Sequence, residues 1–245
     1  MNLKHSRFRY KISNWLYSQS AVFKVRRLFY SQWISRGDLC IDVGANVGNR
    51  TSVFLTLGAS VVAIEPLEKC QQILKLKFGK SIHLVGKAVG AQVGKMPFYE
   101  GNTSTLSTLS SEWKKRVSDT RFVSETWRPA REISVTTLQE IIAQHGVPQF
   151  IKIDVEGFEY EVLMGLHTAV PTISLEYTVP EMSDSLEQCL SLLHKLSREY
   201  KYNYSVGERM ELCAAEWMSY EQMEQHVSSA GFLAGGCGDL YATLA

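Results

Sequence analysis

The chain has 245 residues, 45% of them apolar and 21% charged, so it can bury one sizeable core like an ordinary globular protein. Its 26 lysines and arginines nearly balance its 25 acidic residues, which argues against a dedicated nucleic-acid binder and against an acidic disordered chain. Eight of the basic residues precede Asp38, the first carboxylate, and leave 18 bases against 25 acids in the rest. The composition therefore predicts a basic arm attached to one mildly acidic domain.

Residues 1–36 form this basic arm, which mixes lysines and arginines with aromatic and aliphatic residues, as amphipathic helices do. We expect one or two such helices, packed on the body or forming a contact in a homo-oligomer. The alternative is a docking site for an anionic acceptor, such as a nucleotide-linked or lipid-linked sugar, with peripheral membrane contact through the arm.

No stretch of the sequence approaches the ~18 consecutive apolar residues that a membrane-spanning helix needs, and no secretion signal is recognisable. The five cysteines are scattered, without a CxxC pair or a Cys/His cluster of zinc type. We therefore expect a cytoplasmic protein with reduced thiols.

From residue 38 onward, short apolar runs rich in β-branched residues alternate with segments of helical period, the signature of a parallel sheet covered by helices on both faces. Strands are predicted at 39–43, 60–64, 82–85, 93–99, 133–135, 150–155, 172–177, 202–206 and 240–244. Helices are predicted at 49–57, 66–79, 113–117, 138–145, 160–166, 183–199 and 220–230. The pattern predicts one α/β domain over residues 37–245, built on a doubly wound sheet of about seven strands.

The segment 102–131 interrupts this alternation. Seven of its first ten residues are serine or threonine, and it shows no clear period apart from the short helix around 113–117. Irregular segments of this length inside a compact domain are usually functional. We expect an acceptor-binding loop or lid, and the plain alternative is a mobile surface loop.

The first predicted strand ends in DVGANVG, residues 42–48. Open α/β sheets bind ligands at the carboxyl ends of their strands, where glycines let the backbone approach a ligand and the next helix offers free N–H groups. The spacing is GxxxG, which lacks the middle glycine of the GxGxxG dinucleotide motif. Taken alone, this glycine pair fits a tight turn as well as a binding loop.

Glu65 ends the second predicted strand, 23 residues after Asp42. An acid at this position can accept hydrogen bonds from both hydroxyls of a ribose, which is the adenosine-binding arrangement. The alternative is that Glu65 caps the helix that begins near Pro66.

A third group of polar residues ends the predicted strand 150–155. Lys152, Asp154 and Glu156 have the same parity, so along an ideal strand they point to one face. A lysine and an aspartate within an apolar strand are costly to bury unless they are paired or used. A structural ion pair, with Glu176 as a possible partner, and a functional site are both compatible with this pattern.

These motifs resemble those of the FkbM family of methyltransferases. The resemblance rests on DVGANVG at 42–48, IEP at 64–66, KAVG at 87–90, NTSTLS at 102–107, IKIDVEGFEYEVLMG at 151–165 and SLEY at 174–177. In order and approximate spacing they cover 38–177, more than half of the chain. One departure is Gln139, which follows Leu138 where the family usually has an aspartate, so no role is carried over for that acid.

The resemblance implies a Rossmann-like methyltransferase sheet of seven strands with the last strand antiparallel, and S-adenosylmethionine as the cofactor. It places the methionine part of the cofactor near Asp42, Gly44, Ala45, Asn46 and Gly48. Glu65 and Pro66 would lie at the ribose, Ala88 at the adenine, and Asp154 near the sulfonium and the acceptor. Known relatives mostly methylate hydroxyls of sugars or polyketides, so the family expectation is O-methylation.

An alcohol must lose its proton when it is methylated, and a positioned carboxylate can accept that proton. Asp154 is the first candidate for this general base and Glu156 the second, while Lys152 would keep Asp154 ionised or orient the acceptor. A divalent cation on Asp154 and Glu176 lacks a clear third ligand in the sequence, so we predict no metal.

Two other functions remain open at this point. One is a nicotinamide-dependent oxidoreductase, against which the missing middle glycine and the DVEG motif argue. The other is a scaffold subunit that binds the cofactor but has lost turnover, which the presence of Asp42, Glu65 and Asp154 disfavours.

Overall fold

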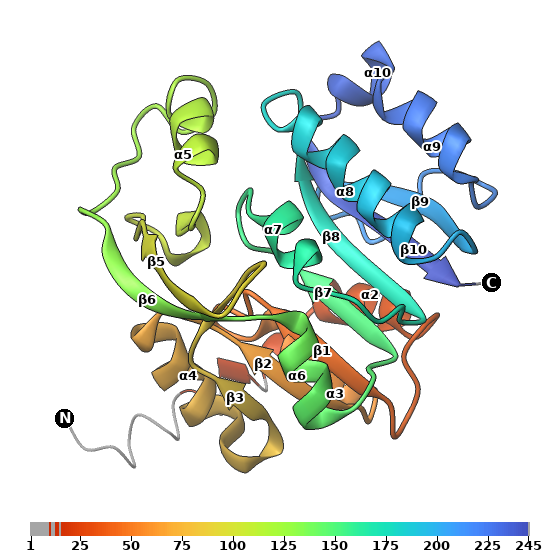
Figure 1. Ribbon diagram of the computed structural model, residues 1–245. Helices are drawn as coiled ribbons and strands as arrows, with labels where there is room; N and C mark the ends of the chain where they lie inside the picture. Colours follow the sequence, from red (N-terminus) through yellow and green to blue (C-terminus); the bar gives the residue numbers. More distant parts are fainter. Residues whose placement is uncertain (1–9, 11–12, 15, 245) are drawn as a thin grey trace.

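The computed structural model describes residues 10, 13, 14 and 16–244, so most of the first fifteen residues of the predicted arm lie outside the described part (Figure 1). The main sheet has seven strands in the order β3-β2-β1-β7-β8-β10-β9. They are β1 (Leu39–Val43), β2 (Ser60–Ile64), β3 (His83–Val85), β7 (Phe150–Ile153), β8 (Thr172–Thr178), β9 (Tyr200–Val206) and β10 (Cys237–Leu244). The first five in the order are mutually parallel, and β10 runs antiparallel to both of its neighbours. This confirms the predicted doubly wound sheet with an antiparallel last strand.

Helices cover both faces of the sheet, because the strands alternate their side chains between two apolar clusters. One face packs against α6 (Leu138–His145), α7 (Glu159–Met164), α8 (Ser183–Leu196) and α9 (Tyr220–Val227). The other face packs against α2 (Ala21–Tyr30) and α3 (Asn49–Thr56). The helix α4 (Glu68–Phe78) contributes to both clusters, is followed by the short η1 (Gly79–Ser81), and α10 (Ala230–Leu233) precedes the last strand.

Local sequence sets several helix boundaries as expected. The Thr137 hydroxyl caps α6 by accepting a hydrogen bond from the Glu140 N–H, and Gly146 with φ of 98° ends that helix. Ser219 and Gln222 form a reciprocal capping box at the start of α9. In the part of the chain that the structure describes, no helix is long and apolar enough to cross a membrane, and all five cysteines are free thiols.

The predicted strand at 133–135 does not continue the main sheet. It belongs to β6 (Arg131–Thr136), which lies in a separate sheet between β4 (Ala88–Val89) and β5 (Gly94–Phe98). The pairing with β5 is antiparallel, so β6 completes a hairpin with a very long connection instead of starting another parallel unit. The prediction of a strand at 133–135 is confirmed, but the strands beside it are set by long-range pairing that the apolar run does not encode.

The connection between β5 and β6 is more ordered than the sequence predicted. It contains η2 (Ser104–Leu106) and α5 (Ser111–Ser118), which extends the short helix expected at 113–117. A small apolar cluster of its own holds it together, with Trp113 and Val117 fully buried. Figure 1 shows α5, β5 and β6 on one side of the molecule and α8 to α10 on the other, with α7 between them.

The helix α2 packs its aromatic side chains on the sheet. Phe29 lies edge-on to Trp33 and to Tyr241 of β10, with ring centroids 5.1 and 5.5 Å apart, and Trp33 stacks on Tyr241. Tyr30 is fully buried against Phe150 of β7. The described part of the arm therefore shares a core with the sheet.

Truncation of Phe29 tests this packing. Phe29 is 5% exposed, so Phe29→Ala should lower the free energy of unfolding by about 3–5 kcal/mol, as large-to-small changes of a buried Phe do. The neighbouring Leu28 is 74% exposed, and Leu28→Ala should change it by less than ~0.5 kcal/mol. Urea unfolding of the two variants measures both values, and equal small losses would show that α2 is not part of the core.

Candidate functional site

A cavity of about 400 Å³ lies at the carboxyl ends of β1, β2, β7 and β8. Of the residues predicted from the sequence, the following line it: Asp42, Gly44, Ala45, Asn46, Glu65, Pro66, Ala88, Asp154 and Glu156. Gly48 and Lys152 do not line the cavity. The parallel sheet thus brings together residues that are up to 114 positions apart in the chain.

The glycine loop after β1 has the shape that its sequence requires. Gly44 has φ of 78°, and a Cβ atom there would lie 1.9 Å from the carbonyl oxygen of Asp154, so the loop passes directly against the end of β7. Gly48, also with positive φ, would place a Cβ 2.4 Å from the ring of Phe78. Gly44 therefore permits the close approach at the cavity, whereas Gly48 permits packing of the loop on α4.

Two buried carboxylates fix this loop. Asp42 accepts a hydrogen bond from the Thr51 hydroxyl of α3, and burial raises the pKa of Asp42. Glu65 accepts hydrogen bonds from the N–H groups of Asn46, at 2.8 Å, and Leu67, at 2.7 Å, and burial raises its pKa to about 7. Glu65 thus supports the residue before α4, as the capping alternative expects, and its oxygens keep lone pairs for a ligand hydroxyl.

Lys152 is 1% exposed and forms ion pairs behind the cavity. Its Nζ lies 2.7 Å from Oδ1 of Asp239 and 3.3 Å from Oδ2 of Asp154. Burial disfavours the ammonium group, but the carboxylates of Asp154 and Asp239 outweigh it and raise the pKa of Lys152 well above its usual value. The suggested ion pair with Glu176 is wrong: Asp239, which lies beside Glu176 in the register of β8 and β10, takes that place.

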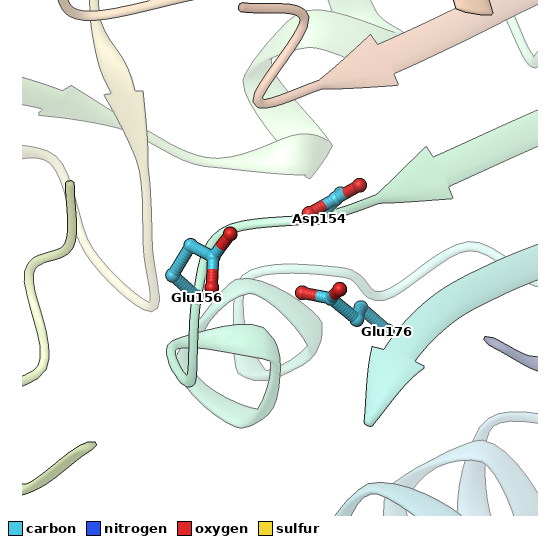
Figure 2. Close-up of side chains that lie close together, drawn as sticks. All are labelled: Asp154, Glu156 and Glu176. Carbon is cyan, nitrogen blue, oxygen red and sulfur yellow. The ribbon is translucent and has the colours of Figure 1, made fainter. Parts of the chain in front are cut away.

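Three carboxylates meet in front of this ion pair, and Figure 2 shows Asp154 directly after β7, Glu156 on the turn that follows and Glu176 near the end of β8. Asp154, Glu156 and Glu176 each place an oxygen within 4.8 Å of the others. Burial, followed by repulsion from the neighbouring carboxylates, raises the pKa of Glu156 and of Glu176 well above the usual range. The group can hold a proton, or a divalent cation, since carboxylate oxygens are the ligands that such cations prefer.

The predicted strand 150–155 is too long. β7 ends at Ile153, and Glu156 has φ of 55°, so strand parity does not describe the residues after Asp154. Glu159 holds this turn by accepting hydrogen bonds from the N–H groups of Val155 and Gly157. Glu156, the second candidate base, therefore reaches the cavity through a turn, and this turn places it as the third carboxylate beside Asp154 and Glu176, which the sequence did not indicate.

The serine- and threonine-rich segment borders the cavity, where residues 104, 105 and 107–109 line it. The hydroxyl of Ser104 donates a hydrogen bond to Oδ1 of Asn46, and that of Thr108 donates one to the carbonyl oxygen of Glu156. The segment is thus bonded to the glycine loop on one side and to the acidic turn on the other. Arg26, Arg50 and Glu208 also line the cavity, and no motif in the sequence indicated them.

The sequence model described as "Methyltransferase FkbM domain" matches residues 42–232. The chain belongs to the FkbM methyltransferase family. It is an S-adenosylmethionine-dependent methyltransferase with a Rossmann-like sheet. The oxidoreductase alternative is therefore rejected.

Solved structures with a similar fold include three methyltransferases. Precorrin-6Y C5,15-methyltransferase of Geobacter metallireducens is 12% identical, with 91% of this chain and 88% of that chain covered and a TM-score of 0.46. A TehB-like methyltransferase of Corynebacterium glutamicum is 10% identical, with 100% of both chains covered and a TM-score of 0.46. An O-methyltransferase of Bacillus cereus, solved with S-adenosylhomocysteine, is 11% identical, with 98% and 91% covered and a TM-score of 0.42. At these values the likenesses carry no argument about the acceptor, and no curated protein matches the chain.

The cavity fits the family's cofactor. Its glycine loop leaves no room for a Cβ at Gly44, and Glu65 stands at the end of β2 with its oxygens directed by two backbone N–H groups. Ala88 and Phe98 add apolar lining beyond Glu65. These residues offer a place for a ribose and an apolar wall for a base, as the resemblance implied.

Glu176→Gln tests the repulsion within the acidic group. The raised pKa of Glu176 means that the folded protein loses stability as pH rises above about 4.5, the ordinary value for Glu. Without ligands, the variant should therefore unfold at a higher temperature than the wild type at pH 8 and show no gain at pH 4. Thermal unfolding at the two pH values measures this difference.

Glu199→Gln, on the exposed surface, is the matched control and should show no gain at either pH. A lower unfolding temperature of Glu176→Gln at pH 8 would contradict the repulsion and indicate that the ionised carboxylate stabilises the fold.

Proposed function

We propose that the chain transfers the methyl group of S-adenosylmethionine to a hydroxyl of a sugar, glycan or polyketide-type acceptor. The observation that carries this proposal is Asp154, a carboxylate that faces the cavity, with 35% of its side chain exposed, while a buried lysine holds it from behind. An alcohol, unlike an amine lone pair, needs a base of this kind when it is methylated.

Bound cofactor supplies a methyl group already activated by the sulfonium charge. The cavity holds the acceptor hydroxyl beside this methyl group, and holding two reacting groups at near-attack distance can lower the activation barrier by on the order of 7–11 kcal/mol. Asp154 accepts the hydroxyl proton at its carboxylate, which typically contributes ~10² to 10⁴-fold. Lys152 acts as a positioning residue, because its Nζ lies 3.3 Å from Oδ2 of Asp154 and orients that carboxylate.

Glu156 is the second candidate for the base. Its raised pKa makes its carboxylate a stronger proton acceptor once it is ionised, and it lies beside Asp154 in the acidic group. Glu176, on the next strand, completes a set of three oxygens around the place where the acceptor hydroxyl would lie. In this proposal the proton that Asp154 takes up stays within the group until the product leaves.

The acceptor would enter past the segment 102–131, since residues 104, 105 and 107–109 of this segment line the cavity. The helix α2 borders the same cavity through Arg26 and presents an exposed face with Val22, Val25 and Leu28 beside Lys24 and Arg27. Apolar and basic side chains on one helix face fit an anionic lipid surface. We therefore propose that the acceptor is lipid-linked or otherwise anionic, and that the protein works in the cytoplasm at the membrane surface.

Asp154→Asn tests the general base. The variant should lower the rate of methyl transfer by about 10²- to 10⁴-fold and keep the affinity for S-adenosylhomocysteine within a few-fold. Transfer of labelled methyl groups to fractionated cell extract, with the product identified, measures the first quantity, and calorimetry the second. Asp119→Asn, on the exposed end of α5, is the control. Near-full turnover of Asp154→Asn would remove Asp154 as the base.

Sedimentation with vesicles tests the lipid surface. The full chain should bind vesicles that contain anionic phospholipid, not neutral ones, and bind more weakly at high salt because the attraction is screened. Leu28→Glu should lower this binding several-fold. Val123→Glu, equally exposed at 74% but far from α2 in the sequence, should not. Equal effects of the two substitutions, or equal binding to neutral vesicles, would contradict the proposal.

A further inference from the structure

One wall of the cavity is built around two arginines. Arg26 comes from α2, and Arg50 lies in the first turn of α3, directly after the glycine loop. Their side chains are 11% and 12% exposed, and the Nη2 atoms of both contact the same oxygen of Glu208, at 2.9 and 2.7 Å. Two cations share one carboxylate, so this wall keeps a net positive charge.

Both guanidinium groups have donors to spare. A guanidinium carries five N–H donors, and the Nε atoms of Arg26 and Arg50 are buried without a hydrogen-bond partner among the residues that the structure describes. The Tyr30 hydroxyl is also buried without a hydrogen-bond partner among those residues, and the centroid of its ring lies 5.9 Å from Cζ of Arg50. These atoms are closed off from the cavity, so the donors that can meet a ligand there are the remaining Nη hydrogens of the two arginines, whose side chains line it.

The charge of the rest of the cavity narrows the choice of ligand. Five acidic side chains line it against one lysine, Lys87; the acids are Asp42, Glu65, Asp154, Glu156 and Glu176. This surface attracts the sulfonium and ammonium groups of S-adenosylmethionine and repels its single anionic group, the carboxylate of the methionine part. The first-turn N–H groups of α3, at the positive end of the helix dipole, favour an anion near Arg50 as well.

The order of the lining residues along the chain agrees with this separation of acidic and basic side chains. Glu65, the glycine loop at Gly44 to Asn46 and Arg50 all line the cavity, and the chain leads from this loop directly into the first turn of α3, where Arg50 lies. A ligand whose ribose is held at Glu65 therefore extends along the loop toward the arginines.

We infer that Arg50 and Arg26 form the binding subsite for the carboxylate of the cofactor's methionine part. Arginine suits this role because its planar fork can bind both oxygens of a carboxylate. Glu208, whose side chain is 66% exposed, holds the two guanidiniums in place. The Tyr17 hydroxyl accepts a hydrogen bond from Nη1 of Arg26, and the Nη hydrogens that neither residue engages are left to the ligand. The inference rests on the proposed methyl transfer only through the cofactor and is independent of the acceptor.

Binding of two product analogues tests the subsite without any turnover. S-adenosylhomocysteine has the carboxylate, and its decarboxylated form keeps the adenosine, the sulfur and the amine but lacks it. Calorimetry should show that wild-type protein binds the complete product roughly 10- to 100-fold more tightly, as expected for a charge-assisted hydrogen bond. In Arg50→Met and Arg26→Met this preference should fall to a few-fold, because only the complete product loses affinity.

Lys87→Met is the matched control, since Lys87 is a cation that lines the same cavity near Ala88. It should leave the preference for the carboxylate unchanged. Arg50→Lys, which keeps the charge but not the fork, should retain part of it, and thermal unfolding shows which variants are folded.

Equal affinity of wild-type protein for the two analogues would overturn the inference without any substitution, and would leave the arginines to an anionic acceptor. An unchanged preference in the folded Arg50→Met and Arg26→Met variants would overturn it as well. The binding experiment contains no acceptor, so its result does not depend on whether the protein methylates a hydroxyl. A failure of the proposed O-methylation would be seen only in the labelled-methyl assay.

Discussion

The ammonium group of Lys152 lies inside the sheet, where an unpaired charge would be prohibitively costly. The carboxylates that compensate it come from distant parts of the chain, Asp239 from β10 and Asp154 from the turn after β7. One ion-pair network therefore joins a central parallel strand to the antiparallel strand that is added last, and it also holds the residue that faces the cavity. Folding and the proposed chemistry share this charge, since loss of Asp239 would leave the ammonium group of Lys152 without its buried partner.

The sequence predicts those parts of the site that depend on local patterns, and it does not predict those that depend on pairing between distant strands. Asp42, Glu65 and Asp154 were found because a parallel sheet gathers the carboxyl ends of its strands at one edge, a property of each strand by itself. Asp239 was missed because its place beside Glu176 depends on the insertion of β10 between β8 and β9, which no local pattern encodes. The separate sheet around β6 was missed for the same reason, since an apolar run specifies a strand but not its partner.

Charge separation organises the cavity. Acidic groups line the side where Asp154, Glu156 and Glu176 meet, and guanidinium groups line the opposite wall. A zwitterionic cofactor with a sulfonium centre has the complementary pattern, so the field of the cavity favours one direction of binding. The near-zero net charge of the chain conceals this arrangement, because the basic residues of α2 and α3 offset the acids at the strand ends.

The segment matched by the family, residues 42–232, is shorter than the unit that builds the site. Arg26 lies on α2 before that segment and Asp239 on β10 after it, and both contact residues within it. A protein expressed to those limits would lack one guanidinium of the cavity wall, the counter-ion of the buried lysine and the strand between β8 and β9. A protein produced for crystallisation or assay should therefore begin before α2 and continue to the end of β10, whatever the limits of the recognisable domain.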